Sequence, residues 1–353
     1  MRCGPFGRVL VLDGRMKRAL LAVAALLVLG GLAARYAFEL LLNRPGPPLT
    51  TPIRIDIAVG EPFRLTAAKL EAAGLVPSAR VLTLWARLEG VDRQIQHGAY
   101  EFREPLTPIA LVEKMRSGEA MVIHVLLPEG ATARDLTSIL EREGLGPAPA
   151  FASLTHDAAF AHSLGVVADG LEGYLFPDTY FFSPLDNAQK ILGMFVARFH
   201  QVFTPELEAE AQRAGFTVHQ IVTLASVIEK ETAREDERPL VSAVFRNRLR
   251  QGMPLQADPT VIYGIENFDG HLTRRDLETP TPYNTYTEPG LPPGPIANPG
   301  RSALLAALRP ADVSYLYFVA RDDGSHEFSS SLADHNRAVN RYQRSRHSRV
   351  QAG

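Results

Sequence analysis

Residues 19–34 form an unbroken run of small and apolar side chains, ALLAVAALLVLGGLAA, which constrains this chain more than any other feature. At about 1.5 Å of rise per residue, a helix over this run reaches roughly 24 Å, slightly less than the thickness of a bilayer core. Arg35 can extend its charged end to the interface, so that residues 36–42 lengthen the apolar contact. The run therefore predicts a transmembrane helix with its flank over residues 19–42.

The charges before the run predict its orientation. Five basic residues stand there against one acid, Asp13. Because positively charged segments stay in the cytoplasm, residues 1–18 are predicted to be cytoplasmic and the rest of the chain to lie across the membrane. A cleaved signal peptide shares the basic start, but no small-x-small cleavage site follows the run. Met16 is a more typical start than Met1, so the first residues can be an extension from a misassigned start.

The bulk properties bound the remaining possibilities. A length of 353 residues exceeds one average domain and predicts two compact units beside the membrane segment. The formal net charge of -2 gives no reason to expect a nucleic-acid partner. Cys3 is the only cysteine, which excludes an intrachain disulfide framework. The ten histidines show no metal-binding spacing, and no nucleotide-binding fingerprint is present, so neither a metal nor a cofactor is predicted.

The part after the membrane segment begins with a sequence repeat. Residues 43–52 form a Pro-rich spacer, and residues 53–57 then alternate as a strand before a helix over 65–73. The same pattern returns seventy residues later, and the matching pairs are Ile53 and Ile123, Gly60 and Gly130, Arg64 and Arg134, Gly74 and Gly144, and Pro77 and Pro147. A strand, a glycine turn, a helix and a glycine cap thus occur twice, although Ala- and Leu-rich sequence can also match by chance.

Periodicity predicts further helices and strands. The segments with helical spacing are 79–88, 108–117, 187–203, 205–214, 218–232 and 238–251. The segments with strand character are 98–102, 315–320 and the surroundings of 327–328. The fold class predicted is α+β, with a small αβ domain followed by a larger, mainly helical α+β domain.

Glu229 is the first candidate for catalysis. The helix over 218–228 is apolar almost all round and is therefore expected to be buried. Both desolvation and the helix dipole disfavour ionisation of a carboxyl at its C-terminal end, which suits a general acid. The small residues Ala225 and Ser226 lie on the same face and leave room for a substrate. The alternative is a carboxylate paired with Lys230 or an arginine on a solvated last turn.

Polar and aromatic clusters beside this helix supply candidates for substrate binding. Amides, carboxylates and hydroxyls can bind sugar hydroxyls or acetamido groups, and tyrosine rings can stack on pyranose faces. Turn capping and core packing are equally good explanations for each of them. The candidates are Gln256, Asp258, Tyr263, Tyr283, Asn284, Thr285, Tyr286 and Asn298, together with Ser226.

Two further carboxylates, Glu172 and Asp178, lie in the aromatic segment LEGYLFPDTY. Their surroundings indicate a packed and hydrogen-bonded structural motif rather than a second catalytic group. Arg246 and Arg248 are expected to hold these acids rather than to contact substrate.

In their order and spacing, the segments LEGYLFPDTY, ASVIEKET, VFRNRL, LQADPTVIYG, YNTY and GLPPGPIANPG resemble those of the endolytic murein transglycosylases of bacteria, the YceG-like family. The resemblance covers roughly residues 50–345. It implies a LysM-like positioning domain over 53–150, a YceG-like catalytic domain over 160–345 and a tail at 346–353. LysM modules bind glycan, and Tyr100 with Phe102 could form a sugar platform, although alternating aromatics on a strand more often belong to the core.

The resemblance also implies a reaction, in which Glu229 matches the acid/base of the family. That residue protonates the oxygen leaving the bond between N-acetylmuramic acid and N-acetylglucosamine, and then accepts the proton of the 6-hydroxyl that attacks. The product is a 1,6-anhydro end within a nascent peptidoglycan strand, whose length is thereby limited. Two alternatives are a hydrolase with Asp258 or Glu231 as base, and a non-catalytic glycan-binding scaffold.

The resemblance implies a cellular setting as well. The chain would be a single-pass protein of the cell inner membrane, with a cytoplasmic N-terminus and a periplasmic catalytic body. Its partners would be peptidoglycan glycan strands and the peptidoglycan synthases, or penicillin-binding proteins, of elongation or division complexes. No cofactor is implied.

Overall fold

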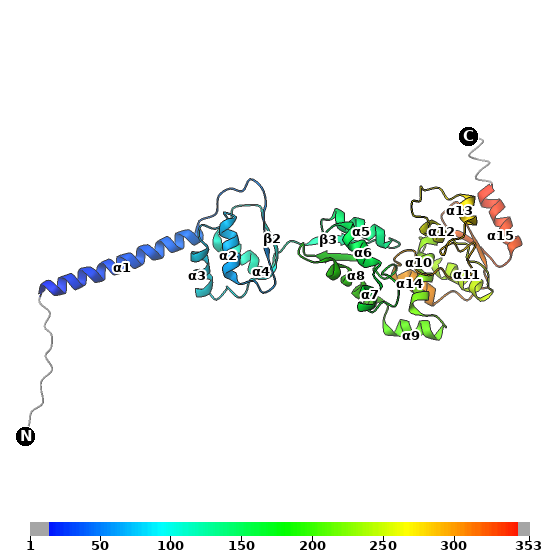
Figure 1. The fold of residues 1–353 in the computed structure, drawn as a ribbon, viewed down its shortest axis with the longest axis horizontal. Coiled ribbons are helices and arrows are strands. Elements are labelled where there is room, and N and C mark those ends of the chain that lie inside the picture. Colours follow the sequence, from blue (N-terminus) through cyan, green and yellow to red (C-terminus); the bar gives the residue numbers. More distant parts are fainter. Residues whose placement is uncertain (1–13, 345–353) are drawn as a thin grey trace, which may run out of the picture. The chain divides into compact units, whose positions relative to one another are not determined.

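The structure is a computed structural model that describes residues 14–344 (Figure 1). Most of the predicted cytoplasmic segment and the predicted tail at 346–353 lie outside the described residues. The chain divides into unit 1, Met1–Val122 with Ser183–Leu185, and unit 2, Ile123–Phe182 with Asp186–Gly353. Residues 123–150, which the sequence analysis placed in the smaller domain, thus belong to the larger unit. The reason is that strand β3 (Ile123–Leu126) pairs with β4 (Thr179–Phe182), which the sequence analysis did not predict.

The N-terminal apolar run is part of helix α1 (Gly14–Asn43). Its segment Arg18–Asn43 has a mean hydropathy of 2.0 and is long and apolar enough to cross a membrane, consistent with a membrane anchor. The C-terminal end of the helix differs from the predicted interfacial flank. Leu42 is buried in the core of unit 1, and Phe38 packs against that core. The last turn of α1 is therefore part of the folded unit.

Unit 1 is a βααβ unit followed by a third helix. Strand β1 (Ile53–Ile57) pairs antiparallel with β2 (Gly98–Phe102), and α2 (Phe63–Ala72) and α3 (Ala79–Leu88) connect them, before α4 (Pro108–Ser117). Tyr100 and Phe102 are fully buried, and the Tyr100 hydroxyl donates to the carbonyl of Met115 at 3.1 Å. They are core residues, so they do not form an exposed sugar platform. The Pro-rich segment lies against this unit, because Leu49 packs on its core.

Unit 2 begins with the repeat that the sequence predicts. Strand β3 leads through a turn into α5 (Ala133–Arg142), as β1 leads into α2. The turn glycines Gly60 and Gly130 have φ of 74° and 75°, and the cap glycines Gly74 and Gly144 have φ of 72° and 77°. Only glycine adopts this left-handed backbone without strain. Helices α6 (Ala148–Thr155) and α7 (Ala158–Ser163) then precede β4, so unit 2 also opens with two antiparallel strands joined through helices.

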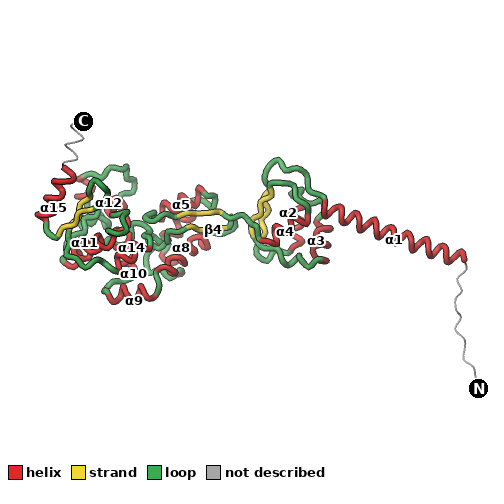
Figure 2. Tube along the Cα trace, turned by 180° about the vertical axis from the view of Figure 1, so that it is seen from behind, coloured by secondary structure: helices red, strands yellow, loops and turns green. Residues whose placement is uncertain are grey.

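The rest of unit 2 is mainly helical (Figure 2). Its elements are α8 (Ala188–Val202), α9 (Pro205–Arg213), α10 (Val218–Glu231), α11 (Arg238–Arg250), α12 (Asp258–Tyr263), α13 (Arg274–Glu278), α14 (Arg301–Leu308), the hairpin of β5 (Tyr317–Ala320) with β6 (His326–Ser329), α15 (Leu332–Val339) and η1 (Asn340–Arg344). Helix α10 starts with a capping box between Thr217 and Gln220, and every residue from Ile221 to Ile228 is buried. The helix that carries the candidate acid is therefore central to the core, where it packs against α14 and α11.

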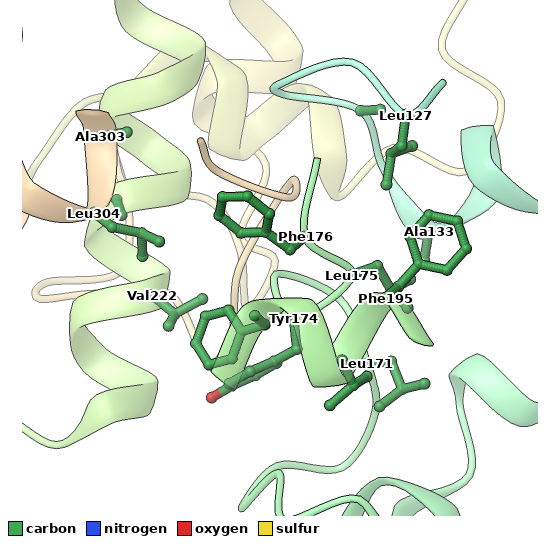
Figure 3. Close-up of a cluster of buried hydrophobic side chains, with 14 of the residues drawn as sticks. Leu127, Ala133, Leu171, Tyr174, Leu175, Phe176, Phe195, Val222, Ala303 and Leu304 are labelled. Carbon is green, nitrogen blue, oxygen red and sulfur yellow. The ribbon is translucent and has the colours of Figure 1, made fainter. Parts of the chain in front are cut away.

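The LEGYLFPDTY segment packs against α10. Tyr174 and Val222 face one another in this core beside Leu304 of α14 (Figure 3). Gly173 has a φ of 87°, and a Cβ placed on it would lie 2.5 Å from Pro295 and 2.8 Å from Val222. The segment is thus fitted closely to the loop of residues 290–300.

Gly173→Ala is expected to lower the free energy of unfolding by about 2–4 kcal/mol, because a strained φ adds to an overpacked contact. Urea unfolding followed by circular dichroism measures the loss. Gly144→Ala is the matched control, since its φ is 77° and no atom lies within 4 Å of the added Cβ. Gly144→Ala therefore introduces only the strain of a positive φ and no close contact. Equal decreases in the free energy of unfolding of the two variants would contradict the close fit at Gly173.

Candidate active site

Helix α10 ends with two carboxylates, Glu229 and Glu231. Residues two apart on a helix point about 200° away from each other, so the two side chains enter different surroundings. The surroundings of each carboxyl determine its hydrogen-bond partners, its protonation and its access to a substrate.

Glu229 is held on both of its oxygens. Its Oε1 accepts from Nη2 of Arg238 at 2.7 Å, and its Oε2 accepts from the backbone N–H of Gly300 at 3.0 Å. The two side chains are only 5% and 4% exposed, respectively. Arg238 also lies 3.5 Å from a carboxylate oxygen of Glu129. The pair therefore joins α10, the start of α11 and the residue that precedes α14.

Opposing effects act on the protonation of Glu229. Burial raises the pKa of this carboxyl, whereas the Gly300 N–H and the charge of Arg238 lower it, and Glu129 raises it again. Each oxygen of this carboxyl thus already accepts a hydrogen bond from the protein, and the side chain is nearly closed off from the surface, which restricts the access of a substrate oxygen. The alternative considered from the sequence, an arginine-paired glutamate, is thus present in a buried form.

Glu231 lines a cavity of about 490 Å³. Within residues 14–344, no group donates a hydrogen bond to its carboxyl. Burial raises the pKa of Glu231 to about 7, the negative charge of Asp258 adds to this rise, and Arg248 opposes it. A carboxyl with a pKa near neutrality, open to a cavity and free of donors, meets the requirements of a general acid.

Three of the predicted substrate-binding residues line the same cavity: Gln256, Asp258 and Tyr286. The hydroxyl of Tyr286 donates to Oδ1 of Asp258 at 2.6 Å, which fixes both side chains. The Gln256 side chain is exposed, and its backbone has a φ of 51°, the only positive value outside glycine among residues 14–344. Such strain persists only where neighbouring contacts hold it, here the bond from the Gln256 N–H to the carbonyl of Thr285 at 3.0 Å.

Three other residues that were predicted to bind substrate are buried in the core, where they support the site. Ser226 is buried and accepts from the N–H of Ile296 at 3.0 Å. Asn284 donates to three carbonyls, the shortest bond being 2.7 Å to Thr279. Thr285 accepts from the N–H of Ala257 at 3.0 Å. Their side chains are thus engaged with the protein itself, which leaves them a supporting role.

Tyr263 and Asn298 belong to a different place, around Glu172. The Glu172 carboxyl accepts from the Tyr263 hydroxyl at 3.2 Å, from Nδ2 of Asn298 at 3.2 Å and from the N–H of Ala133 at 3.0 Å. Burial raises its pKa to about 7, opposed first by the Ala133 N–H. Glu172 and Tyr263, with Tyr283, line a second cavity of about 470 Å³.

The arginines predicted to hold Glu172 and Asp178 do not do so. Asp178 pairs with Arg198 of α8 at 2.7 Å. Arg246 stacks on the ring of Phe216, and Arg248 donates to the carbonyls of Leu316 and Leu255 at 2.7 and 2.8 Å. Arg248 therefore fixes the backbone on two sides of the Glu231 cavity, a role that its sequence position does not indicate.

From the sequence alone, Glu231 is a candidate only for the base of a hydrolase. Helix α10 is buried on all sides from Ile221 to Ile228, so its apolar pattern does not say which of its terminal carboxylates faces a cavity. The two glutamates differ in their long-range contacts. Glu229 contacts Arg238 of α11, whereas Glu231 lies in the cavity beside residues 255–258.

The chain is similar to known proteins along most of its length. A profile of the YceG-like family matches residues 55–341. A protein of Bacillus subtilis (strain 168) named endolytic murein transglycosylase is 30% identical over 331 residues, which is 90% of this chain and 91% of that protein. A protein with the same name from Streptococcus pneumoniae (strain D39) is 26% identical over 81% of this chain, which spans 58% of its length.

A solved structure is also similar. The 2.6 Å crystal structure of a YceG-like protein from Listeria monocytogenes has a TM-score of 0.57 and 29% sequence identity to this chain. The similarity covers 81% of this chain and 98% of the Listeria chain.

Proposed function

The chain belongs to the YceG-like family, and from this membership we infer that it is an endolytic murein transglycosylase. It cleaves the bond between N-acetylmuramic acid and N-acetylglucosamine within peptidoglycan strands and leaves 1,6-anhydro ends. The strongest support is the Bacillus subtilis relative, which carries this name and matches over nearly the full length of both chains. The activity makes the chain a lytic transglycosylase that limits glycan length.

We propose Glu231 as the acid/base of this reaction, in place of Glu229. The observation that carries this proposal is the cavity, where the unbonded carboxyl of Glu231 lies beside Gln256, Asp258 and Tyr286. Glu229 instead neutralises the buried cation of Arg238. Under this proposal Glu229 stabilises the fold through its ion pair, and Glu231 transfers the protons of the reaction.

The proposed reaction needs one carboxyl group. Protonated Glu231 donates its proton to the glycosidic oxygen as the bond from that oxygen to C1 of N-acetylmuramic acid breaks. The 6-hydroxyl oxygen of the same sugar bonds to C1, and its proton passes to the Glu231 carboxylate. The nucleophile is intramolecular, so positioning supplies much of the rate. The charge of Asp258 favours both the protonated acid and the positive charge that develops on the sugar.

A hydrolase is the second candidate, because Asp258 places another carboxylate in the same cavity. Digestion of peptidoglycan by the full chain in ¹⁸O-labelled water separates the two. A transglycosylase gives anhydro ends without label, since the oxygen that attacks comes from the sugar. Labelled reducing ends would instead assign the chain to the hydrolases.

The acid role of Glu231 sets the pH dependence. We expect kcat/KM to fall as the pH rises through about 7, where the raised pKa of Glu231 leaves the group without its proton. Asp258→Asn removes a charge that raises this pKa, so the alkaline fall is expected to move to lower pH. Rates of anhydro-end formation across a pH series measure both effects.

Asp312→Asn is the control for this series, because Asp312 is exposed and does not line the cavity. Its profile is expected to match that of the wild type. An alkaline fall that stays in place in Asp258→Asn would contradict the assignment of the titrating group to Glu231.

We further propose that α1 anchors the chain once in the cell inner membrane, with the N-terminus in the cytoplasm and the chain that follows α1 in the periplasm. The basic residues before the apolar run of α1 support this orientation. The βααβ part of unit 1 would be the LysM-like positioning domain, and peptidoglycan synthases would be the partners. Protease added outside spheroplasts tests the orientation, since it should remove the chain that follows α1 and spare the N-terminus.

A further inference from the structure

The second cavity of unit 2 has no part in the proposed reaction. It lies between Ala133 at the start of α5, the segment 167–172 before β4, and Pro293 in the loop of residues 290–300. Tyr263 and Tyr283 contribute aromatic rings to its wall, with ring centroids 4.9 Å apart and planes tilted by 56°. Its volume of about 470 Å³ falls within the range of ligand-binding pockets.

Hydrogen bonds hold this cavity in shape. The Tyr263 hydroxyl donates to Glu172, whose carboxyl also accepts from Ala133. His219 bonds the Tyr174 hydroxyl at 3.0 Å and the carbonyl of Pro293 at 3.0 Å. The rings and the polar groups are thus fixed before any ligand enters, which reduces the entropy lost on binding.

The lining indicates the chemistry of the ligand. Among the described residues, no lysine or arginine lines the cavity, so a phosphate or another anion would meet no cationic side chain in its wall. The wall instead combines tyrosine rings with the carboxyls of Glu172 and Asp169 and with His156. Apolar rings bordered by hydrogen-bonding groups suit a neutral ligand with one apolar face and many hydroxyls, which is the description of a pyranose sugar.

Two segments connect this cavity with the one that contains Glu231. Helix α12 contributes Asp258 to the Glu231 cavity from its first residue and Tyr263 to the second cavity from its last. These ends are separated by about 7–8 Å of helical rise. The segment of residues 283–286 likewise contributes Tyr286 to the first cavity and Tyr283 to the second. A polymer bound at one cavity is therefore in reach of the other.

We propose that the cavity lined by Tyr263 and Tyr283 is a distal saccharide-binding site for the glycan strand whose cleaved bond lies at Glu231. The inference rests on the proposed function. Occupation of both cavities requires a strand that continues beyond the reacting sugars, so the site favours cleavage within a strand over cleavage at its end. Long strands gain affinity from the second contact, and short ones do not.

Binding of uncrosslinked glycan strands to the full chain in detergent tests the proposal. The measurement uses Glu231→Gln, so that the strands stay intact, with long strands compared against a tetrasaccharide. Adding Tyr283→Ala is expected to raise the Kd for long strands about tenfold and to leave the Kd for the tetrasaccharide in place, because a stacking surface is lost. Tyr283→Phe keeps the ring and is expected to keep the affinity.

Val167→Glu covers the case in which Tyr283→Ala does not fold. Val167 is exposed at the rim of the cavity, and a carboxylate there is expected to weaken long-strand binding through repulsion of the acidic peptide stems. Equal effects on both ligand lengths, or none in either variant, would overturn the proposal. Failure of the proposed function gives a different result, the absence of anhydro ends from the wild-type chain.

Discussion

Glu231→Gln is expected to lower the rate of anhydro-end formation by about 10²- to 10⁴-fold, the usual contribution of general acid–base catalysis. The amide fills the same volume but cannot donate a proton to the glycosidic oxygen or accept one from the 6-hydroxyl. Chromatography of the digested glycan with mass detection measures the anhydro ends. Since burial disfavours the charged carboxylate, the variant is also expected to be at least as stable as the wild type above pH 7.

Glu235→Gln is the matched control for this loss. Glu235 lies four residues further along the chain, is exposed and does not line the Glu231 cavity. It is expected to retain the wild-type rate. A folded Glu231→Gln variant that keeps more than a tenth of the wild-type rate would exclude Glu231 as the acid.

Glu229→Gln is expected to lower the free energy of unfolding by about 3–5 kcal/mol, the cost of removing one partner from a buried ion pair. The cation of Arg238 would remain, 4% exposed, without the carboxylate at 2.7 Å that neutralises it. Two of its guanidinium nitrogens have no hydrogen-bond partner among the described residues, and the remaining carboxylate, that of Glu129, is 3.5 Å away and 48% exposed. Chemical denaturation of the full chain in detergent measures the loss.

The double variant Glu229→Gln/Arg238→Met separates the ion pair from other effects of the substitution. An apolar side chain leaves no buried cation, and the double variant is expected to recover most of the lost stability. If the double variant were as unstable as Glu229→Gln, the loss would not come from the unpaired charge.

Local sequence patterns predicted helices α2 to α4 of unit 1 and α8 to α11 of unit 2, but not the short helices α6, α7 and α12 to α15. Helices 79–88 and 108–117 have the predicted bounds, and α10 and α11 each end one residue before the predicted position. These segments follow their own apolar periodicity, which is a local property. The strand β4 was not predicted, since its four residues acquire strand geometry by pairing with β3, more than fifty residues earlier in the chain.

The site was harder to predict because its contacts are long-range. The carboxyl of Glu172 meets Tyr263 and Asn298, which lie 91 and 126 residues away. Gln256, Asp258 and Tyr286 could be proposed as polar residues in ordered loops, but whether they faced Glu229 or Glu231 depended on how α10 is rotated in its core. A helix buried on all sides carries no sequence signal for that rotation.

The roles of the two glutamates follow from their partners rather than from their own chemistry. At Glu229, a cation and a backbone N–H occupy the oxygens, and at Glu231 the carboxyl remains open to a cavity. Both groups have a raised pKa, so acidity alone does not distinguish them. The two glutamates are distinguished by whether a substrate oxygen can reach the carboxyl proton.

The most direct test compares Glu229→Gln and Glu231→Gln at a low temperature at which circular dichroism shows both variants to be folded. Anhydro ends formed from uncrosslinked glycan strands are counted for each variant beside the wild type. We predict that folded Glu229→Gln forms anhydro ends and that folded Glu231→Gln does not. The reverse result, an inactive Glu229→Gln beside an active Glu231→Gln, would return the acid/base role to Glu229.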